Sequence, residues 1–167
     1  MKKRMLCALL ALTLLCGCAS AQALPDMVRL HVVAADDSPQ AQALKLMLRD
    51  VCLRCAEVCL SDAEDADEAY RRLENHLADF EAACIARARE LGFEGEIRAE
   101  TGVFEFPDRI YGAVKVPAGE YRALRVTIGA GEGHNWWCVL YPSLCALDES
   151  ALQTSRVLSW LRERIGG

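Results

Sequence analysis

A histidine, an asparagine and a cysteine lie close together in residues 131–145, and these are the residue types of a thiol protease. His134 and Cys138 are four positions apart, which is about 13 Å along an extended strand. This separation exceeds hydrogen-bonding distance, so they do not pair as base and nucleophile unless the chain folds back. His31 is the other candidate base for Cys138. One candidate function is therefore a thiol hydrolase or wall-modifying enzyme that uses Cys138 with a histidine.

Three further cysteines, Cys52, Cys55 and Cys59, fall within about 120° of one another on the wheel of a predicted helix. They could hold zinc if Cys84 from the next helix supplied a fourth ligand, or they could form a disulfide. Core packing is favoured over both, because Cys55 lies within an apolar stripe and free cysteine behaves as a small buried hydrophobe. We therefore expect no metal site and no cofactor.

The first 23 residues have the pattern of an export signal. Basic residues at positions 2–4 precede an apolar stretch at 5–15, and small residues that suit cleavage follow at 19–23. The apolar stretch is too short for a stable membrane-spanning helix. A second interpretation stays open, because residues 15–18 also resemble a bacterial lipobox in which Cys18 becomes the lipidated first residue. Both interpretations predict export, and they differ in whether the product is anchored.

Residues 24–167 suit a single domain without a linker or repeat. Removing the signal takes away three basic and no acidic residues, which changes the net charge from −5 to −8. An acidic domain does not favour nucleic acid or an anionic lipid surface. We therefore expect no nucleic-acid partner, and membrane contact only through a lipid on Cys18.

Export also bears on Cys138 and Cys145, because exported chains meet oxidising conditions more often than cytosolic ones. The two cysteines are seven positions apart across Pro142. A disulfide between them would close a loop of about eight residues and contribute roughly 2.5 kcal/mol. Two buried thiols remain the alternative. Six cysteines in residues 24–167 allow fifteen complete pairings, so the sequence does not assign the disulfides.

The elements that position these residues follow from periodicity. The alternation at 28–32 predicts a strand with three apolar residues on one face and Arg29 and His31 on the other. Ser38 is a predicted N-cap with Pro39 at the first helical position, and apolar residues continue at helical spacing to about residue 60. A second long helix is predicted from after residue 62 to Gly92, pairing with the first as an antiparallel hairpin.

From residue 96 the sequence changes to short β-rich runs separated by turn residues. A closing helix is predicted from residue 149 or 150. The predicted fold is α+β, with a mostly antiparallel sheet of about five strands, a long helical hairpin and a C-terminal helix. The strands predicted after the first are 97–106, 110–116, 121–128 and 136–141.

Two groups of residues are candidates for partner contact. Gln42, Lys45 and Arg49 are spaced i, i+3 and i+7 opposite the apolar stripe, which predicts either a contact face or a merely solvated one. Trp136 and Trp137 are adjacent, so in a strand they point to opposite faces. One ring should then belong to the core and the other be available to a partner, unless a helix covers the second face.

The segment containing the tryptophans resembles a motif of the stage II sporulation protein R family of endospore-forming bacteria, G-E-G-x-N-W-W-C-V-x-F-P-P-L-C. Residues 28–50 are similar to the family's V-R-L-H-V-I-A-N-S-D-S-x-x-D-Q-x-L-K-x-x-V-R-D, and residues 117–126 to P-A-G-x-Y-x-A-L-R-V. The departures are Ala35, Asp36, Ala41, Leu48, Tyr141 and Ser143. Most preserve shape, whereas positions 35 and 41 lose the family's Asn and Asp.

The resemblance implies a signalling protein that is not itself an enzyme. Such a protein is made in the forespore, exported into the space between forespore and mother cell, and there activates a membrane-embedded aspartic protease. That protease matures the precursor of sporulation sigma factor E. The residues that we expect to contact it lie in the matching motifs and are Arg29, His31, Asp37, Gln42, Lys45, Arg49, Asn135, Trp136 and Trp137.

Overall fold

The computed structural model describes residues 26–112 and 114–143. The export signal with Cys18, the closing helix and Cys145 lie outside these residues, so those predictions stay as they are. The described elements, in chain order, are β1 (Val28–Val33), α1 (Pro39–Cys59), α2 (Ala66–Asn75), α3 (Leu77–Glu90), β2 (Ile97–Phe106), β3 (Arg109–Tyr111), β4 (Val114–Val116), β5 (Gly119–Ile128) and β6 (Asn135–Tyr141).

The main sheet has four strands in the order β2-β5-β1-β6, and it is mixed. β1 runs parallel to β5, whereas β1 with β6 and β2 with β5 are antiparallel. The α+β class is confirmed, but the prediction of a mostly antiparallel sheet of about five strands is not fully met. The predicted strand 110–116 is wrong, because the chain turns at Gly112 with a φ of 57° and forms the separate β3-β4 hairpin.

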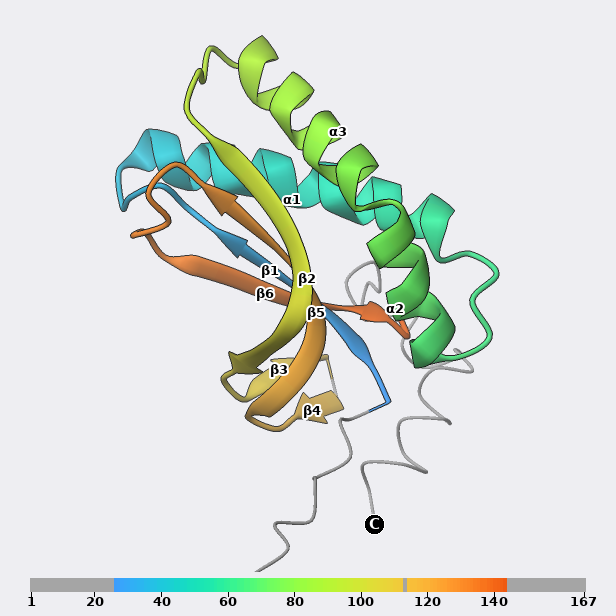
Figure 1. Cartoon of the computed structure of the whole chain (residues 1–167). Helices are drawn as coiled ribbons and strands as arrows, with labels where there is room; N and C mark the ends of the chain where they lie inside the picture. Colours follow the sequence, from blue (N-terminus) through green and yellow to red (C-terminus); the bar gives the residue numbers. More distant parts are fainter. Residues whose placement is uncertain (1–25, 113, 144–167) are drawn as a thin grey trace, which may run out of the picture.

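The predicted second helix is two helices that meet at His76. The His76 backbone leaves helical geometry, with φ −106° and ψ 13°, and its N–H closes α2 by donating to the Arg72 carbonyl. After this break α3 packs along α1, as Figure 1 shows. The predicted pairing of two helices therefore holds for α1 and α3.

The start of α1 forms as predicted. Ser38 Oγ accepts a hydrogen bond from the Ala41 N–H at 3.2 Å, and Pro39 occupies the first helical position, where no N–H is needed. This cap fixes the direction in which the helix leaves the end of β1.

Alternation along the strands divides the apolar residues between two faces. The helices cover one face, where Val28, Leu30 and Val32 of β1 are fully buried in an apolar cluster that they share with α1, α2 and α3. None of the described helices covers the other side, which we call the helix-free face. A smaller apolar cluster there includes Phe106, Tyr121 and the β3-β4 hairpin residues. Within the described ranges, no helix combines the length and apolar character needed to cross a membrane.

Candidate functional site

The loop between β5 and β6 lies against the segment that joins β1 to α1. The backbone N–H groups of Glu132 and Gly133 donate to the carbonyls of Ala35 and Ala34 at 3.1 and 3.0 Å. A Cβ on Gly133 would overlap the backbone carbonyl of Asp36, so only glycine fits this approach. The loop thereby places His134 next to the first turn of α1.

Asp37 and His134 form the outer part of this contact. The Asp37 carboxylate accepts hydrogen bonds from the His134 backbone N–H at 2.7 Å and from the His134 ring Nδ1. Both hydrogen bonds lower the pKa of Asp37, and the one from the His134 backbone has the larger effect. Both side chains are exposed, so this pair orients the loop rather than contributing much stability.

Lys45 and Gln42 form the inner part. Lys45 Nζ donates to Gln42 Oε1 at 2.6 Å and to the His134 carbonyl at 2.9 Å, and Gln42 Nε2 donates to Asp37 Oδ1 at 3.3 Å. Only 6% of Lys45 is exposed, and burial lowers its pKa. The four residues Asp37, Gln42, Lys45 and His134 are called the polar network below.

The prediction that Gln42, Lys45 and Arg49 form one surface opposite the core is wrong for Lys45. The β5-β6 loop covers this turn of α1, and its carbonyl supplies an acceptor for the buried ammonium.

Replacing Lys45 by methionine is therefore expected to lower the free energy of unfolding by about 1 to 3 kcal/mol, because the hydrogen bonds of the buried ammonium to two partly buried or exposed residues, Gln42 and His134, are lost. Arg49→Met is the matched control, since Arg49 is partly exposed and pairs with Asp50 at 2.7 Å. It should change stability by less than about 1 kcal/mol. Urea denaturation measures both, and equal losses would contradict a structural role specific to Lys45.

Arg49 extends the polar network toward Trp136. Its guanidinium carbon lies 5.2 Å from the centroid of the Trp136 ring, within cation–π distance. Trp136 pairs with Val32 across β1 and packs against the apolar cluster under the helices, yet it stays partly exposed. Asn135, at the start of β6, is exposed.

Trp137 lies on the helix-free face, as the predicted alternation requires. Its ring stacks on His31 at 5.8 Å between centroids, and the Arg109 guanidinium carbon lies 4.4 Å from its centroid. Trp137 is also partly exposed. Each tryptophan therefore presents part of its ring beside an arginine, on opposite faces of the same strand.

Arg29 lies deeper on the same face and is 0% exposed. Its guanidinium carbon is 4.1 Å from the Phe106 centroid and 4.9 Å from the Tyr121 centroid. Nη2 donates to Tyr111 Oη at 2.9 Å and Nε to the Cys138 carbonyl at 3.4 Å, whereas Nη1 has no hydrogen-bond partner among the described residues. A partner cannot reach this side chain in the structure, so Arg29 supports the surface rather than forming it.

His31 is partly buried between Trp137 and Phe106. Neither ring nitrogen meets hydrogen-bond geometry with any described residue. Burial lowers the pKa of His31, and the nearby Asn135 side chain opposes this effect only in part.

This lowered pKa predicts that acidification destabilises the fold. Below about pH 6.5 the unfolded chain is protonated at His31, whereas His31 in the folded chain stays neutral to lower pH. The free energy of unfolding therefore decreases as the pH is lowered, by at most about 1.4 kcal/mol per pH unit. His31→Phe keeps an aromatic ring without the titration. Denaturation at pH 7.5 and 5.5 should show a smaller acid loss for the variant, and identical losses would contradict the prediction.

The arrangement gives no support to a thiol hydrolase. Cys138 packs against the apolar cluster under the helices, whereas His31 lies on the helix-free face. The sheet separates the two side chains, so they cannot act as a nucleophile and base. His134 is bound to Asp37 in the loop. Cys138 is moreover disulfide-bonded, which removes its thiolate; its pairing with Cys145 stays a prediction, because Cys145 is outside the described residues.

The cysteines of α1 do not assemble a metal site. Within residues 26–112 and 114–143, no three His, Cys, Asp or Glu side chains are positioned to hold one ion. Cys52, Cys55, Cys59 and Cys84 are free thiols, and all four contribute to or pack against the apolar cluster under the helices. Core packing, the favoured interpretation of the sequence, is what the structure contains.

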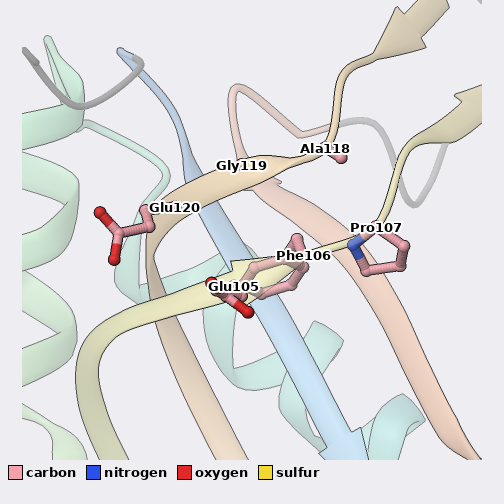
Figure 2. A pocket seen from close by; sticks show the side chains of 6 residues that line it. All are labelled: Glu105, Phe106, Pro107, Ala118, Gly119 and Glu120. Atoms are coloured by element: carbon pink, nitrogen blue, oxygen red, sulfur yellow. The ribbon is translucent and has the colours of Figure 1, made fainter.

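A hollow of about 590 Å³ lies where β2 ends and β5 begins. Figure 2 shows Glu105 and Glu120 at this hollow together with Phe106 and Pro107. The two glutamates are direct cross-strand partners, and both are exposed. No hydrogen bond or ion pair with another described residue holds either carboxylate in place, so the hollow gives no support to a catalytic pair.

The structure thus separates the predicted contact residues into two sets. Those of the first set are Asp37, Gln42, Lys45, Arg49 and Trp136, near the start of α1, and those of the second are Arg29, His31, Asn135 and Trp137, on the helix-free face. Sequence reasoning missed Arg109 and Tyr111 and the bond between His134 and Asp37. No local pattern marks them, because each depends on a turn that brings distant segments together.

These features define an α+β domain with a mixed sheet whose edge strand presents two tryptophans on opposite faces. Residues 25–151 match the family described as stage II sporulation protein R. A Bacillus subtilis (strain 168) protein named "Stage II sporulation protein R" is 37% identical over 128 residues, which cover 76% of this chain and 57% of that protein. The chain belongs to the stage II sporulation protein R family, which supports a role in sporulation. No solved structure matches it.

Proposed function

We propose that this chain is an exported sporulation signal that activates a membrane-embedded aspartic protease. That protease would then mature the precursor of sporulation sigma factor E. The observation that carries the proposal is the family match over residues 25–151, since it includes every predicted contact residue. The 128 residues aligned with the Bacillus subtilis relative cover 57% of that protein, so activity and partner are proposed here for the domain that both chains share.

The site supports binding rather than catalysis. Tryptophan and arginine are the residues most enriched at interface hot spots, and β6 places one partly exposed tryptophan beside an arginine on each face. The chain would act allosterically, by binding the active state of the protease more tightly than the inactive state. The export signal at 1–23 would deliver it to the space between forespore and mother cell, either free or tethered through Cys18.

Co-expression in a non-sporulating bacterium tests the proposal. The host would carry the full chain, the sporulation aspartic protease and a tagged sigma factor precursor. We expect the shortened sigma factor only when all three are present. Absence of processing with all three present at normal levels would refute the proposed signal.

A variant of the protease that lacks its catalytic aspartate is the control that separates signal from enzyme. Processing should stop completely with this variant. If the sigma factor were still shortened, the chain itself would be the hydrolase. Deleting residues 1–23 should also abolish processing while leaving the domain folded, because the chain would no longer be exported.

A further inference from the structure

Two buried thiols meet where α1 packs against α3. Cys52 and Cys84 are both 0% exposed, and their sulfur atoms lie 3.6 Å apart. Both are free thiols, although they are 32 positions apart in the chain.

The distance is close to what a disulfide requires. A disulfide bond is about 2.05 Å long, so the two sulfurs would have to approach by roughly 1.5 Å. Side-chain rotation at both cysteines supplies most of such a movement, and α1 and α3 already lie side by side (Figure 1). Cys55 and Cys59 lie on the same helix as Cys52 but are only partly buried.

We propose that Cys52 and Cys84 form an oxidative cross-link site that ties α1 to α3 when the exported chain meets a low-molecular-weight disulfide. The two protein thiols lose two protons and two electrons as their S–S bond forms. The oxidant RSSR accepts them, its own S–S bond breaks, and two RSH molecules leave. The cross-link does not depend on the identity of the signalling partner. The cross-link proposal can therefore be wrong while the proposed function is right, and the proposed function can be wrong while the cross-link forms.

Cys55 is the entry point for the oxidant. The buried pair is closed to a small disulfide, whereas Cys55 is partly exposed, lies one helical turn from Cys52 on α1 and packs against the apolar cluster that contains Cys84. RSSR would first form a mixed disulfide with Cys55 and release one RSH. The Cys84 thiolate then attacks the Cys55 sulfur, which expels the second RSH, and Cys52 finally attacks the Cys84 sulfur and releases the Cys55 thiol. The hydrogen bond from Cys52 lowers the pKa of Cys84, which favours Cys84 as the attacking group.

Peptide mapping of the full chain tests the site directly. The protein would be incubated with mixtures of oxidised and reduced glutathione, its remaining thiols alkylated, and the product digested with trypsin. Cleavage after Arg49, Arg54, Arg72 and Arg87 places Cys52, Cys84 and the pair of Cys55 and Cys59 on three separate peptides. Mass spectrometry should therefore find the peptide 50–54 linked to 73–87.

Two variants make the test specific. Cys55→Ser should slow the appearance of this linked peptide at least tenfold without lowering its final yield, because the entry thiol is lost while the pair remains. Cys52→Ala should abolish it. Oxidation should raise the melting midpoint of the wild type by roughly 10 °C and that of Cys52→Ala much less, since a disulfide here closes a loop of about 30 residues.

Recovery of Cys52 and Cys84 as fully alkylated thiols under the most oxidising mixture would overturn the proposal. So would a Cys84 link that joins only the peptide containing Cys55 and Cys59. An unchanged rate in Cys55→Ser would overturn the entry route.

Discussion

Replacing Arg29 by alanine is expected to lower the free energy of unfolding by about 2 to 5 kcal/mol, a large part of the stability of one domain. The side chain is completely buried, and its guanidinium lies within cation–π distance of the rings of both Phe106 and Tyr121. Truncation removes both contacts and leaves a cavity in the smaller apolar cluster. It also takes the donors away from Tyr111 Oη and the Cys138 carbonyl.

Arg29→Met is the matched variant that separates packing from charge. Methionine refills most of the volume, and it removes a buried charge that has no carboxylate partner among the described residues. We expect it to cost less than about 1 kcal/mol. Chemical denaturation of the two variants decides the point. A methionine variant as unstable as the alanine variant would show that hydrogen bonds of the charged group, rather than packing, hold this cluster together.

The sequence predicts most of what depends on local pattern. The two faces of β1 and the alternation of Trp136 and Trp137 follow from the two-residue period of a strand. The start of α1 follows from Ser38 and Pro39, whose chemistry acts within one turn. In each case the physical cause lies within a few residues of its effect.

Features that depend on distant segments were not predictable in the same way. The parallel pairing of β1 with β5 joins strands about 90 residues apart, and periodicity carries no information on strand direction. Lys45 has the spacing of a surface residue and is buried only because the β5-β6 loop crosses its turn of α1. The candidate site shows the same limit: its residue types and the opposite faces of the two tryptophans were predicted, but the arginine that lies beside each tryptophan ring was not.

The break between α2 and α3 at His76 was not predicted for a different reason. The apolar stripe continues through α2 and α3, so hydrophobic periodicity alone predicts one helix. His76 ends α2 through its backbone, and its ring bonds Asp79 Oδ2 at 2.9 Å in the first turn of α3. The only sequence signal for this helix end was His76, a polar residue whose side chain can bond the next turn. Such a residue marks a helix end less strongly than a proline or a glycine does.

Trp136 and Trp137 carry the prediction with the largest expected effect on function. The Trp136 ring packs against the apolar cluster under the helices, whereas the Trp137 ring lies on the thinner helix-free face between His31 and Arg109. Truncating Trp136 therefore removes packing from the edge of the main core, and we expect Trp136→Ala to lose about 3 kcal/mol, the lower end of the range for core aromatic residues. Trp137→Ala loses ring contacts that are partly exposed and should lose about 1 to 2 kcal/mol.

Signalling should respond in the opposite order. A partly exposed tryptophan that anchors a partner contributes up to several kcal/mol to binding, so folded Trp137→Ala should give at least tenfold less sigma factor maturation in the co-expression assay. Trp137→Phe is the control, because it keeps a ring beside Arg109 and should recover part of the signal. Arg109→Met removes only the cation and should weaken signalling less than the loss of the ring.

Thermal melts of the purified variants separate this hypothesis from the simpler one, in which both rings serve only the core. If both alanine variants melt early together, then neither tryptophan is a dedicated contact residue. If Trp137→Ala is folded and fully active, the contact must lie elsewhere, and the polar network at the start of α1 becomes the surface to examine. Only a folded and inactive Trp137→Ala, beside an early-melting Trp136→Ala, fits a strand with one face for the core and the other for a partner.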